Sequence, residues 1–227
     1  KERNIIHRTG YALRQSDDDN VDSYRIPGLV TTNKGTLIAV YDARHQTNID
    51  LQEDIDIGMS RSTDGGKSWE PMKIIMDMGE YNGLPQSQNG IGDPAVLVDE
   101  RTNTIWASAV WVHGLANARA WRSVRPGMKP EDGTGQIMLA NSTDDGLTWS
   151  DPINITSMVK TRDMPMLLQG PGRGITMRDG TLVFPVQYKS VENDLRGEIS
   201  VIYSKDHGLT WHRANPVPTD GGISEPQ

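Results

Sequence analysis

The sequence predicts an all-β protein built as a β-propeller, and three observations support this fold class. Apolar residues form only 35% of the 227-residue chain, below the ~45–50% usual for globular proteins, a count that also includes glycine. Its 23 glycines and 13 prolines interrupt short runs rich in branched and aromatic residues, which is typical of strands and turns. One turn motif occurs three times, which indicates a repeated sheet unit.

The strands are predicted from runs of four to eight residues that are closed by turn residues. Turns that need a positive φ are expected at 33–35, 145–146 and 179–180, where glycine follows Asn-Lys or Asp. Residues 115–125 have some helical character, which Pro126 and Gly127 end, and no helix of three turns is expected. In chain order, the predicted strands lie at 36–41, 95–98, 104–111, 136–140, 181–184 and 198–203.

The repeated motif is S-x-D-x-G-x-[ST]-W, and its copies span 62–69, 142–149 and 204–211. We expect its Asp to accept N–H bonds within its own turn, its Gly to supply a positive φ and its Trp to pack on neighbouring strands. The unequal spacing of the copies predicts sheet units with insertions of variable length. The motif resembles the Asp-box of sialidase-like propellers, which implies structural roles for three residues, Asp64, Asp144 and Asp206.

A second set of residues resembles the N-terminal signature of bacterial exo-α-sialidases, or neuraminidases. The set comprises Y-R-I-P-G at 24–28, G-T-L-I-A-V-Y-D-A-R at 35–44 and Asp50, six residues beyond Arg44. The resemblance covers nearly the whole chain but only the front part of a sialidase domain. It implies a six-bladed propeller, truncated on its C-terminal side, in which residues 1–227 form roughly the first four blades at ~40–50 residues each plus insertions.

The resemblance also implies site residues. Arg25 is the first of three arginines that bind the carboxylate of sialic acid, a task suited to a planar, permanently charged guanidinium. Arg44 contacts the O4 side of the sugar, Asp50 is the general acid/base and Asp93 is a further residue of the pocket. Trp111 is predicted on the apolar wall for the N-acetyl methyl group. Alternatives stay open: a surface Arg25 on a strand edge, ion pairs of Arg44 with Asp42 or Asp50, a solvated Asp50, a turn-starting Asp93 and a Trp111 in the core.

Glu225 resembles the family glutamate that acts as base on a tyrosine nucleophile; its alternative is an ordinary terminal residue. A neutral phenol avoids the like-charge repulsion that a carboxylate would meet at a carbon bearing its own carboxylate. The family pattern places this tyrosine and two more arginines after Glu225, so we expect them in a C-terminal part, without which the 227 residues should not hydrolyse sialosides. The tyrosines of this sequence all precede Glu225: Tyr11, Tyr24, Tyr41, Tyr81, Tyr188 and Tyr203.

The function implied is that of a glycoside hydrolase that releases terminal α-linked sialic acids from glycoconjugates with retention of configuration. The alternatives are a trans-sialidase, an intramolecular trans-sialidase and a non-catalytic Asp-box propeller that binds glycans. Expected partners are sialylated glycans, glycoproteins or glycolipids. Action in the periplasm or outside the cell follows from that substrate class alone.

Composition excludes several other classes. A net charge of −7 without any Lys/Arg run argues against nucleic-acid binding. The absence of cysteine excludes disulfides, Cys-ligated zinc and thiol nucleophiles, and the five histidines lack metal-site spacing, so no metal or cofactor is expected. The most apolar stretch, 105–116, is too short and polar to span a membrane. The first residues lack the apolar core of a signal peptide.

Overall fold

The computed structural model describes residues 12–192, 194–219 and 225–226. β-Strands dominate these residues, and the two α-helices are single turns, Ala120–Ser123 (α1) and Thr156–Val159 (α2). Three short 3₁₀ helices lie at Asp18–Asn20, Gln86–Gln88 and Pro130–Asp132. The predicted all-β class is therefore confirmed. In the part of the chain that is described, no helix has the length and apolarity needed to cross a lipid bilayer.

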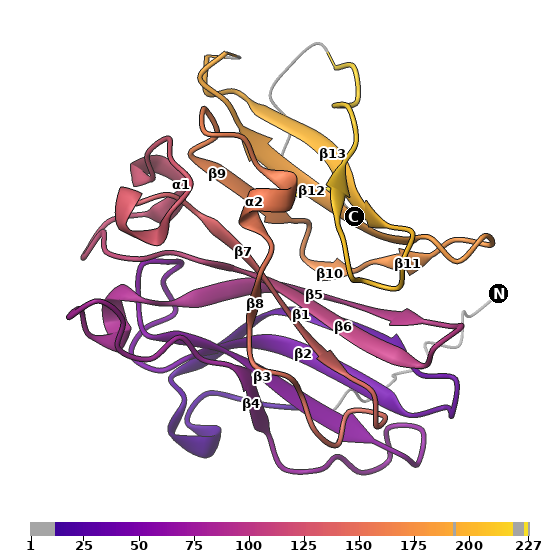
Figure 1. Ribbon diagram of the computed structural model, residues 1–227. Coiled ribbons are helices and arrows are strands. Elements are labelled where there is room, and N and C mark those ends of the chain that lie inside the picture. The colour runs from indigo at the N-terminus through magenta and orange to yellow at the C-terminus, as the bar shows by residue number, and fades with distance from the viewer. Residues whose placement is uncertain (1–11, 193, 220–224, 227) are drawn as a thin grey trace, which may run out of the picture.

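Three sheets follow one another along the chain, and Figure 1 shows them fanned from the indigo N-terminal sheet to the yellow C-terminal one. The first has the order β1-β2-β3-β4, with Ser23–Thr31 (β1), Leu37–Arg44 (β2), Ile55–Ser62 (β3) and Lys73–Met76 (β4). The second has the order β10-β5-β6-β7-β8, with Ile91–Asp99 (β5), Thr104–Trp111 (β6), Gln136–Ser142 (β7), Ile153–Asn154 (β8) and Gly172–Arg173 (β10). The third has the order β11-β12-β13-β14, with Met166–Gln169 (β9) also paired to β12, and contains Ile175–Thr176 (β11), Leu182–Lys189 (β12), Gly197–Ser204 (β13) and His212–Arg213 (β14).

The hydrophobic core lies between successive sheets, and the alternation along β5 shows how one strand serves two interfaces. Val96 and Val98 pack into the cluster shared with the first sheet, whereas Ala95 and Leu97 pack into the cluster shared with the third. Successive side chains of a strand point to opposite faces, so a central sheet buries both. Burying such a valine or leucine contributes roughly 1.5–3 kcal/mol. Sheets packed face to face in chain order are the blades of a propeller, as predicted.

The three Asp-box turns each connect the last two strands of a sheet, β3 to β4, β7 to β8 and β13 to β14, and they share one set of hydrogen bonds. In the second copy, the Asp144 carboxylate accepts the Thr148 N–H at 2.8 Å, the Thr148 hydroxyl at 2.5 Å and the Ser142 hydroxyl at 2.9 Å. The Ser142 oxygen in turn accepts the Gly146 N–H at 2.9 Å. The carboxylates of Asp64 and Asp206 are held in the same way.

The residue that follows the box Asp reaches back to the preceding sheet. Asp145 accepts the hydroxyls of Thr32 at 2.7 Å and Thr36 at 2.6 Å and pairs with Arg61 at 2.9 Å, all in the first sheet or its turn. At the equivalent position of the third copy, His207 Nδ1 lies 2.7 Å from an oxygen of Asp99 in the second sheet. The box turns therefore also connect neighbouring blades.

The described residues form three sheets, whereas about four blades were expected from chain length. The reason is that long connections enlarge the units. Residues 45–54 join β2 to β3, and residues 112–135 join β6 to β7. The two connections meet through backbone hydrogen bonds, from Gln52 N–H to Ala118 C=O at 3.0 Å and from Ala120 N–H to Leu51 C=O at 2.7 Å. Their meeting point carries the candidate site.

Candidate active site

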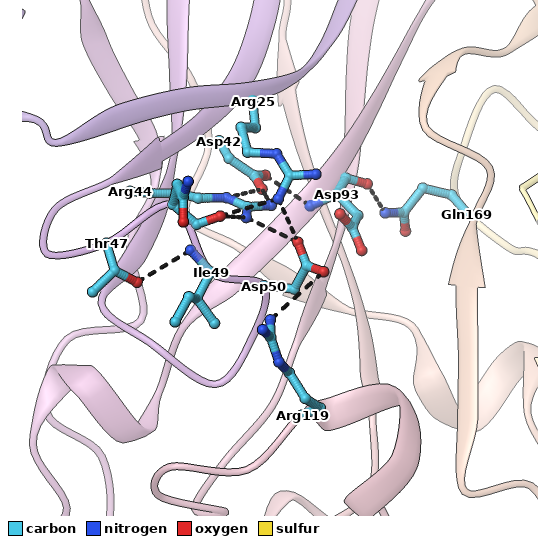
Figure 2. Close-up of polar contacts among 10 residues, drawn as sticks. Arg25, Asp42, Arg44, Thr47, Ile49, Asp50, Asp93, Arg119 and Gln169 are labelled. Atoms are coloured by element: carbon cyan, nitrogen blue, oxygen red, sulfur yellow. Dashed lines mark hydrogen bonds and ion pairs between the residues drawn. The ribbon is translucent and has the colours of Figure 1, made fainter. Parts of the chain in front are cut away.

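Two arginines from the first sheet meet one carboxylate at the centre of the site. Arg25 on β1 and Arg44 at the end of β2 each place Nη1 2.9 Å from Asp50 Oδ1. The same nitrogens donate to the Asn48 carbonyl, at 3.0 and 2.8 Å. Arg119 comes within 3.9 Å of Asp50 Oδ2, and Figure 2 shows it on the side opposite the other two arginines. Asp50 thus lies among three cations.

The guanidinium of Arg44 is held in place by Asp42, which lies two residues earlier on the same face of β2. Asp42 Oδ2 accepts Arg44 Nη2 at 2.7 Å and Nε at 3.0 Å, and both side chains are 1% exposed. Asp42 Oδ1 accepts the Asp93 N–H at 2.8 Å, which ties β2 to β5 of the next sheet. Both ion pairs that the sequence left open for Arg44 are present. Arg44 does not line the cavity, because its guanidinium is bound to the carboxylates of Asp42 and Asp50.

The same backbone conformation, a residue with positive φ that precedes a proline, occurs at three places on the cavity. Ile26, Asp93 and Glu225 each have a positive φ, of 56°, 57° and 55°, and each precedes a proline. At the first two, the strand pairing shifts by one residue, which marks a β-bulge. A bulge re-aims a side chain, and all three of these residues line the cavity. The Ile26-Pro27, Asp93-Pro94 and Glu225-Pro226 pairs are therefore equivalent positions in successive parts of the fold.

Both polar and apolar side chains line the cavity between these residues. Its volume is about 290 Å³, near the lower limit of ~300 Å³ for small-molecule sites. The polar lining residues are Arg25, Asp50, Asp93, Gln187 and Glu225. The remaining lining residues are apolar: Ile26, Leu51, Val110, Ala120, Trp121, Met166 and Leu168. Among the described residues, none that lines this cavity is a tyrosine.

Four of the predicted site residues line the cavity, namely Arg25, Asp50, Asp93 and Glu225, whereas Arg44 and Trp111 do not. Trp111 is 3% exposed and belongs to the core cluster between the first two sheets, where Tyr81 packs edge-on against it. The tryptophan that lines the cavity is Trp121, on α1. The carboxylates of the Asp-box residues accept hydrogen bonds within their own turns. None of the three, Asp64, Asp144 and Asp206, lines the cavity.

Several cavity residues were missed by sequence reasoning. Gln187 on β12 accepts the Glu225 N–H through Oε1 at 2.6 Å and so positions that glutamate. Gln169 on β9 donates to the carbonyl of Asp93. Glutamine side chains on strands carry no spacing signal of their own. The X-Pro pattern at 26–27, 93–94 and 225–226 is the signal that was present in the sequence.

Charge and burial act together on Asp93. Burial raises the pKa of the Asp93 carboxyl above its usual range, Arg44 opposes the rise, and the negative charges of Asp50 and Glu225 add to it. Three carboxyl groups therefore share one cavity with Arg25. This combination suits a ligand that is anionic at one end and needs proton transfer at a nearby oxygen.

One nearby group has the composition of a metal site. His45, Asp54 and Asp56 place one ligand atom each within 4.8 Å of one another. His45 Nε2 and Asp56 Oδ2 already bond at 2.8 Å, and the Gln86 amide donates to both Asp56 oxygens. Only Asp54 Oδ1 is buried without a partner. The group is therefore held together by its own hydrogen bonds.

Comparison with known proteins gives one consistent result. The family model for a BNR repeat-like domain matches residues 26–227. A sialidase of Bacteroides fragilis is 54% identical over 219 residues, which cover 96% of this chain and 40% of that protein. The solved structure of the Hadza microbial sialidase Hz136 is 58% identical with a TM-score of 0.90, over 93% of this chain and 41% of that one.

A more distant structure shares the fold. The intramolecular trans-sialidase from Ruminococcus gnavus is 20% identical with a TM-score of 0.74, over 90% of this chain and 63% of that one. The present chain thus spans about two fifths of the Bacteroides relative and of the Hadza enzyme.

Proposed function

The chain belongs to the bacterial sialidase family with BNR repeat-like domains, and from this premise we propose that the protein hydrolyses terminal α-linked sialic acids of glycoconjugates. The observation that carries the proposal is that Arg25 and Asp50 are paired on one cavity that apolar side chains also line. The substrate has the matching chemistry: a carboxylate on the anomeric carbon, a scissile oxygen beside it and an N-acetyl methyl group.

Arg25 and Asp50 divide the work at the anomeric centre. The Arg25 guanidinium, 44% exposed, binds the substrate carboxylate through its N–H fork. Asp50, anchored from behind by Arg44, transfers a proton to the glycosidic oxygen as the bond to the leaving group breaks. The N-acetyl group lies against the apolar wall formed by residues such as Trp121 and Met166.

We assign Glu225 as the base that takes the proton of a tyrosine nucleophile, in accord with the family resemblance. Attack of the phenolate oxygen forms a covalent glycosyl intermediate, and a water deprotonated by Asp50 then releases the sugar with net retention. Supporting this role, Glu225 lines the cavity, and its backbone is held by Gln187. By the same resemblance, the tyrosine and the other two arginines belong to the part of the relatives' length that this chain does not span. Glycans on the outside of cells are the substrates, so we further propose that the protein acts in the periplasm or outside the cell.

The leaving group provides the sharpest test of the acid role. Asp50→Asn, made in the protein expressed from its complete gene, should lower kcat/KM for 3′-sialyllactose by about 10²–10⁴-fold, the usual worth of a general acid. With 4-methylumbelliferyl sialoside the loss should be much smaller, because that phenol leaves without a proton. Gln15→Leu, at an exposed residue that does not line the cavity, serves as control. Equal losses on both substrates, or none, would remove Asp50 from this role.

The products of the same assay separate the alternatives. Free sialic acid that appears first as the α-anomer in NMR spectra supports retaining hydrolysis. Transfer to added lactose indicates a trans-sialidase, and an anhydro sugar indicates intramolecular transfer. Binding of sialosides without any turnover would favour the non-catalytic glycan-binding alternative.

A further inference from the structure

A second hollow lies directly beside the cavity, on the far side of Asp50. It measures about 440 Å³. Asp50, Leu51, Ala120 and Trp121 line both spaces, so the two hollows meet along these residues. Only the second hollow is also lined by Arg119, which directly precedes α1, and by Arg122, which lies in α1.

Cations gather around this second hollow although the chain carries a net charge of −7. Arg119 is 52% exposed, and the carboxylate it approaches among the residues that the structure describes is that of Asp50, at the long distance of 3.9 Å. Arg122 is exposed, and no ion pair joins it to any carboxylate of the described residues. Lys189 on β12 lies 4.0 Å from the centre of the Trp121 ring and donates to the Trp121 carbonyl at 2.7 Å. Burial lowers the pKa of Lys189, and the nearby Arg122 charge lowers it further.

The position of the hollow follows from the chemistry of Asp50. A group that donates a proton to the glycosidic oxygen lies between the sugar that is retained and the sugar that leaves. Arg25 holds the retained sugar on one side of Asp50. The leaving group must therefore extend toward the other side, where Arg119 approaches, as Figure 2 shows.

We infer that Arg119, Arg122 and Trp121 form a leaving-group subsite that prefers an anionic sugar next to the scissile bond. The inference rests on the proposed function, because it assigns the neighbouring cavity to the sialic acid. Exposed guanidinium groups with no strong carboxylate partner bind carboxylates and sulfates through paired N–H groups. The Trp121 ring, oriented by Lys189, supplies apolar surface beside them. The anion is the carboxylate of a second sialic acid or a sulfate ester on the penultimate sugar.

The test compares substrates in the protein expressed from its complete gene. The set comprises 4-methylumbelliferyl sialoside, 3′-sialyllactose, an α2,8-linked disialyllactose and a sulfated 3′-sialyllactose. The variants are Arg122→Gln and, as matched control, Arg125→Gln, an exposed arginine of the same segment outside both hollows. We expect wild-type kcat/KM to be about 10-fold higher for an anionic than for the neutral leaving group, the effect of one charge-assisted contact.

The expected pattern is that Arg122→Gln abolishes this preference and leaves the 4-methylumbelliferyl substrate unaffected, whereas Arg125→Gln keeps it. A preference for the disialyl or the sulfated substrate alone identifies the anion. Equal rates on neutral and anionic leaving groups, or a preference that survives Arg122→Gln, would overturn the subsite. No turnover of any of the four substrates by the wild type would instead remove the proposed function.

Discussion

Arg25 and Asp50 form an ion pair of 2.9 Å in which both side chains are well exposed, 44% and 60%. The residue that we propose to bind the substrate carboxylate is thus bonded to the residue that we propose to transfer the proton. An incoming carboxylate competes with Asp50 for the same guanidinium. Arg44, which is buried and paired with Asp42, also forms an ion pair with Asp50 that does not involve Arg25. On the proposed function, we expect substrate binding to release Asp50 from one of its two close cations.

Replacing Arg25 should affect binding and turnover together. Arg25→Gln removes the fork for the substrate carboxylate and should lower kcat/KM by about 10²-fold, the worth of one or two charge-assisted hydrogen bonds. Arg25→Lys keeps the charge but not the planar fork, so it should recover only part of the loss. Steady-state kinetics on 4-methylumbelliferyl sialoside measure both. Full activity of Arg25→Gln would show that this arginine does not hold the substrate.

The buried pair beneath the site should matter more for stability than the exposed pair above it. Asp42→Asn leaves the Arg44 charge without its buried partner, which costs about 3–5 kcal/mol in such sites. Asp50→Asn, at a 60% exposed carboxylate, should change the free energy of unfolding by under ~1 kcal/mol. Urea unfolding of both variants gives the comparison. Similar losses for the two would contradict this division of roles.

Apolar runs in the sequence predicted most of the longer strands of the three sheets. The strands β2, β5, β6, β7, β12 and β13 all contain predicted runs, because each buries alternating or continuous apolar residues. The two-residue strands β8, β10, β11 and β14 are too short to show any periodicity. Strand β1 was not predicted, since Pro27 interrupts it; the structure accommodates this proline at a bulge.

The positions of Trp111 and Trp121 depend on long-range contacts, which local sequence patterns do not reveal. Trp111 and Val110 are neighbours on β6, yet strand parity sends Trp111 into the core with Ala109 and turns Val110 to the cavity. The place of Trp121 depends on how the 112–135 connection joins the loop of Asp50, through Ala120 and Leu51. Neither residue has a spacing pattern that reveals such a meeting. The motif residues Arg25, Asp50, Asp93 and Glu225, in contrast, were placed together by resemblance and do meet in the structure.

Contacts between blades predict a large effect at Asp145. Asp145→Ala leaves Arg61 and the hydroxyls of Thr32 and Thr36 without their shared acceptor, across the interface of two sheets. We expect a loss of about 2–4 kcal/mol in the free energy of unfolding, the scale of buried acceptors with several donors. Asp151→Ala, at an exposed aspartate close by, is the matched control and should change it by under ~0.5 kcal/mol. Equal effects in thermal or urea unfolding would show that the blades do not depend on this contact.

Lys160 should give the protein a pH-dependent stability in the alkaline range. Its ammonium is 5% exposed and donates to the Gly127 carbonyl at 2.6 Å and the Thr134 hydroxyl at 2.5 Å, with no carboxylate in contact. Burial lowers the pKa of Lys160 to about 8. Between about pH 8 and 10.4 the unfolded chain therefore holds a proton that the folded chain has lost, so the free energy of unfolding rises with pH in this window. Below about pH 8 both states hold the proton, and this contribution no longer changes with pH.

Lys160→Met removes this titration. The difference in unfolding free energy between wild type and variant should shift by about 2 kcal/mol in favour of the wild type from pH 7 to pH 10. Lys34→Met, at an exposed lysine, should show no such shift, because its ammonium is hydrated in both states. Urea unfolding at several pH values measures the three proteins side by side. Parallel pH profiles for wild type and Lys160→Met would mean that Lys160 stays charged in the folded protein across this range, with its two hydrogen bonds compensating for burial.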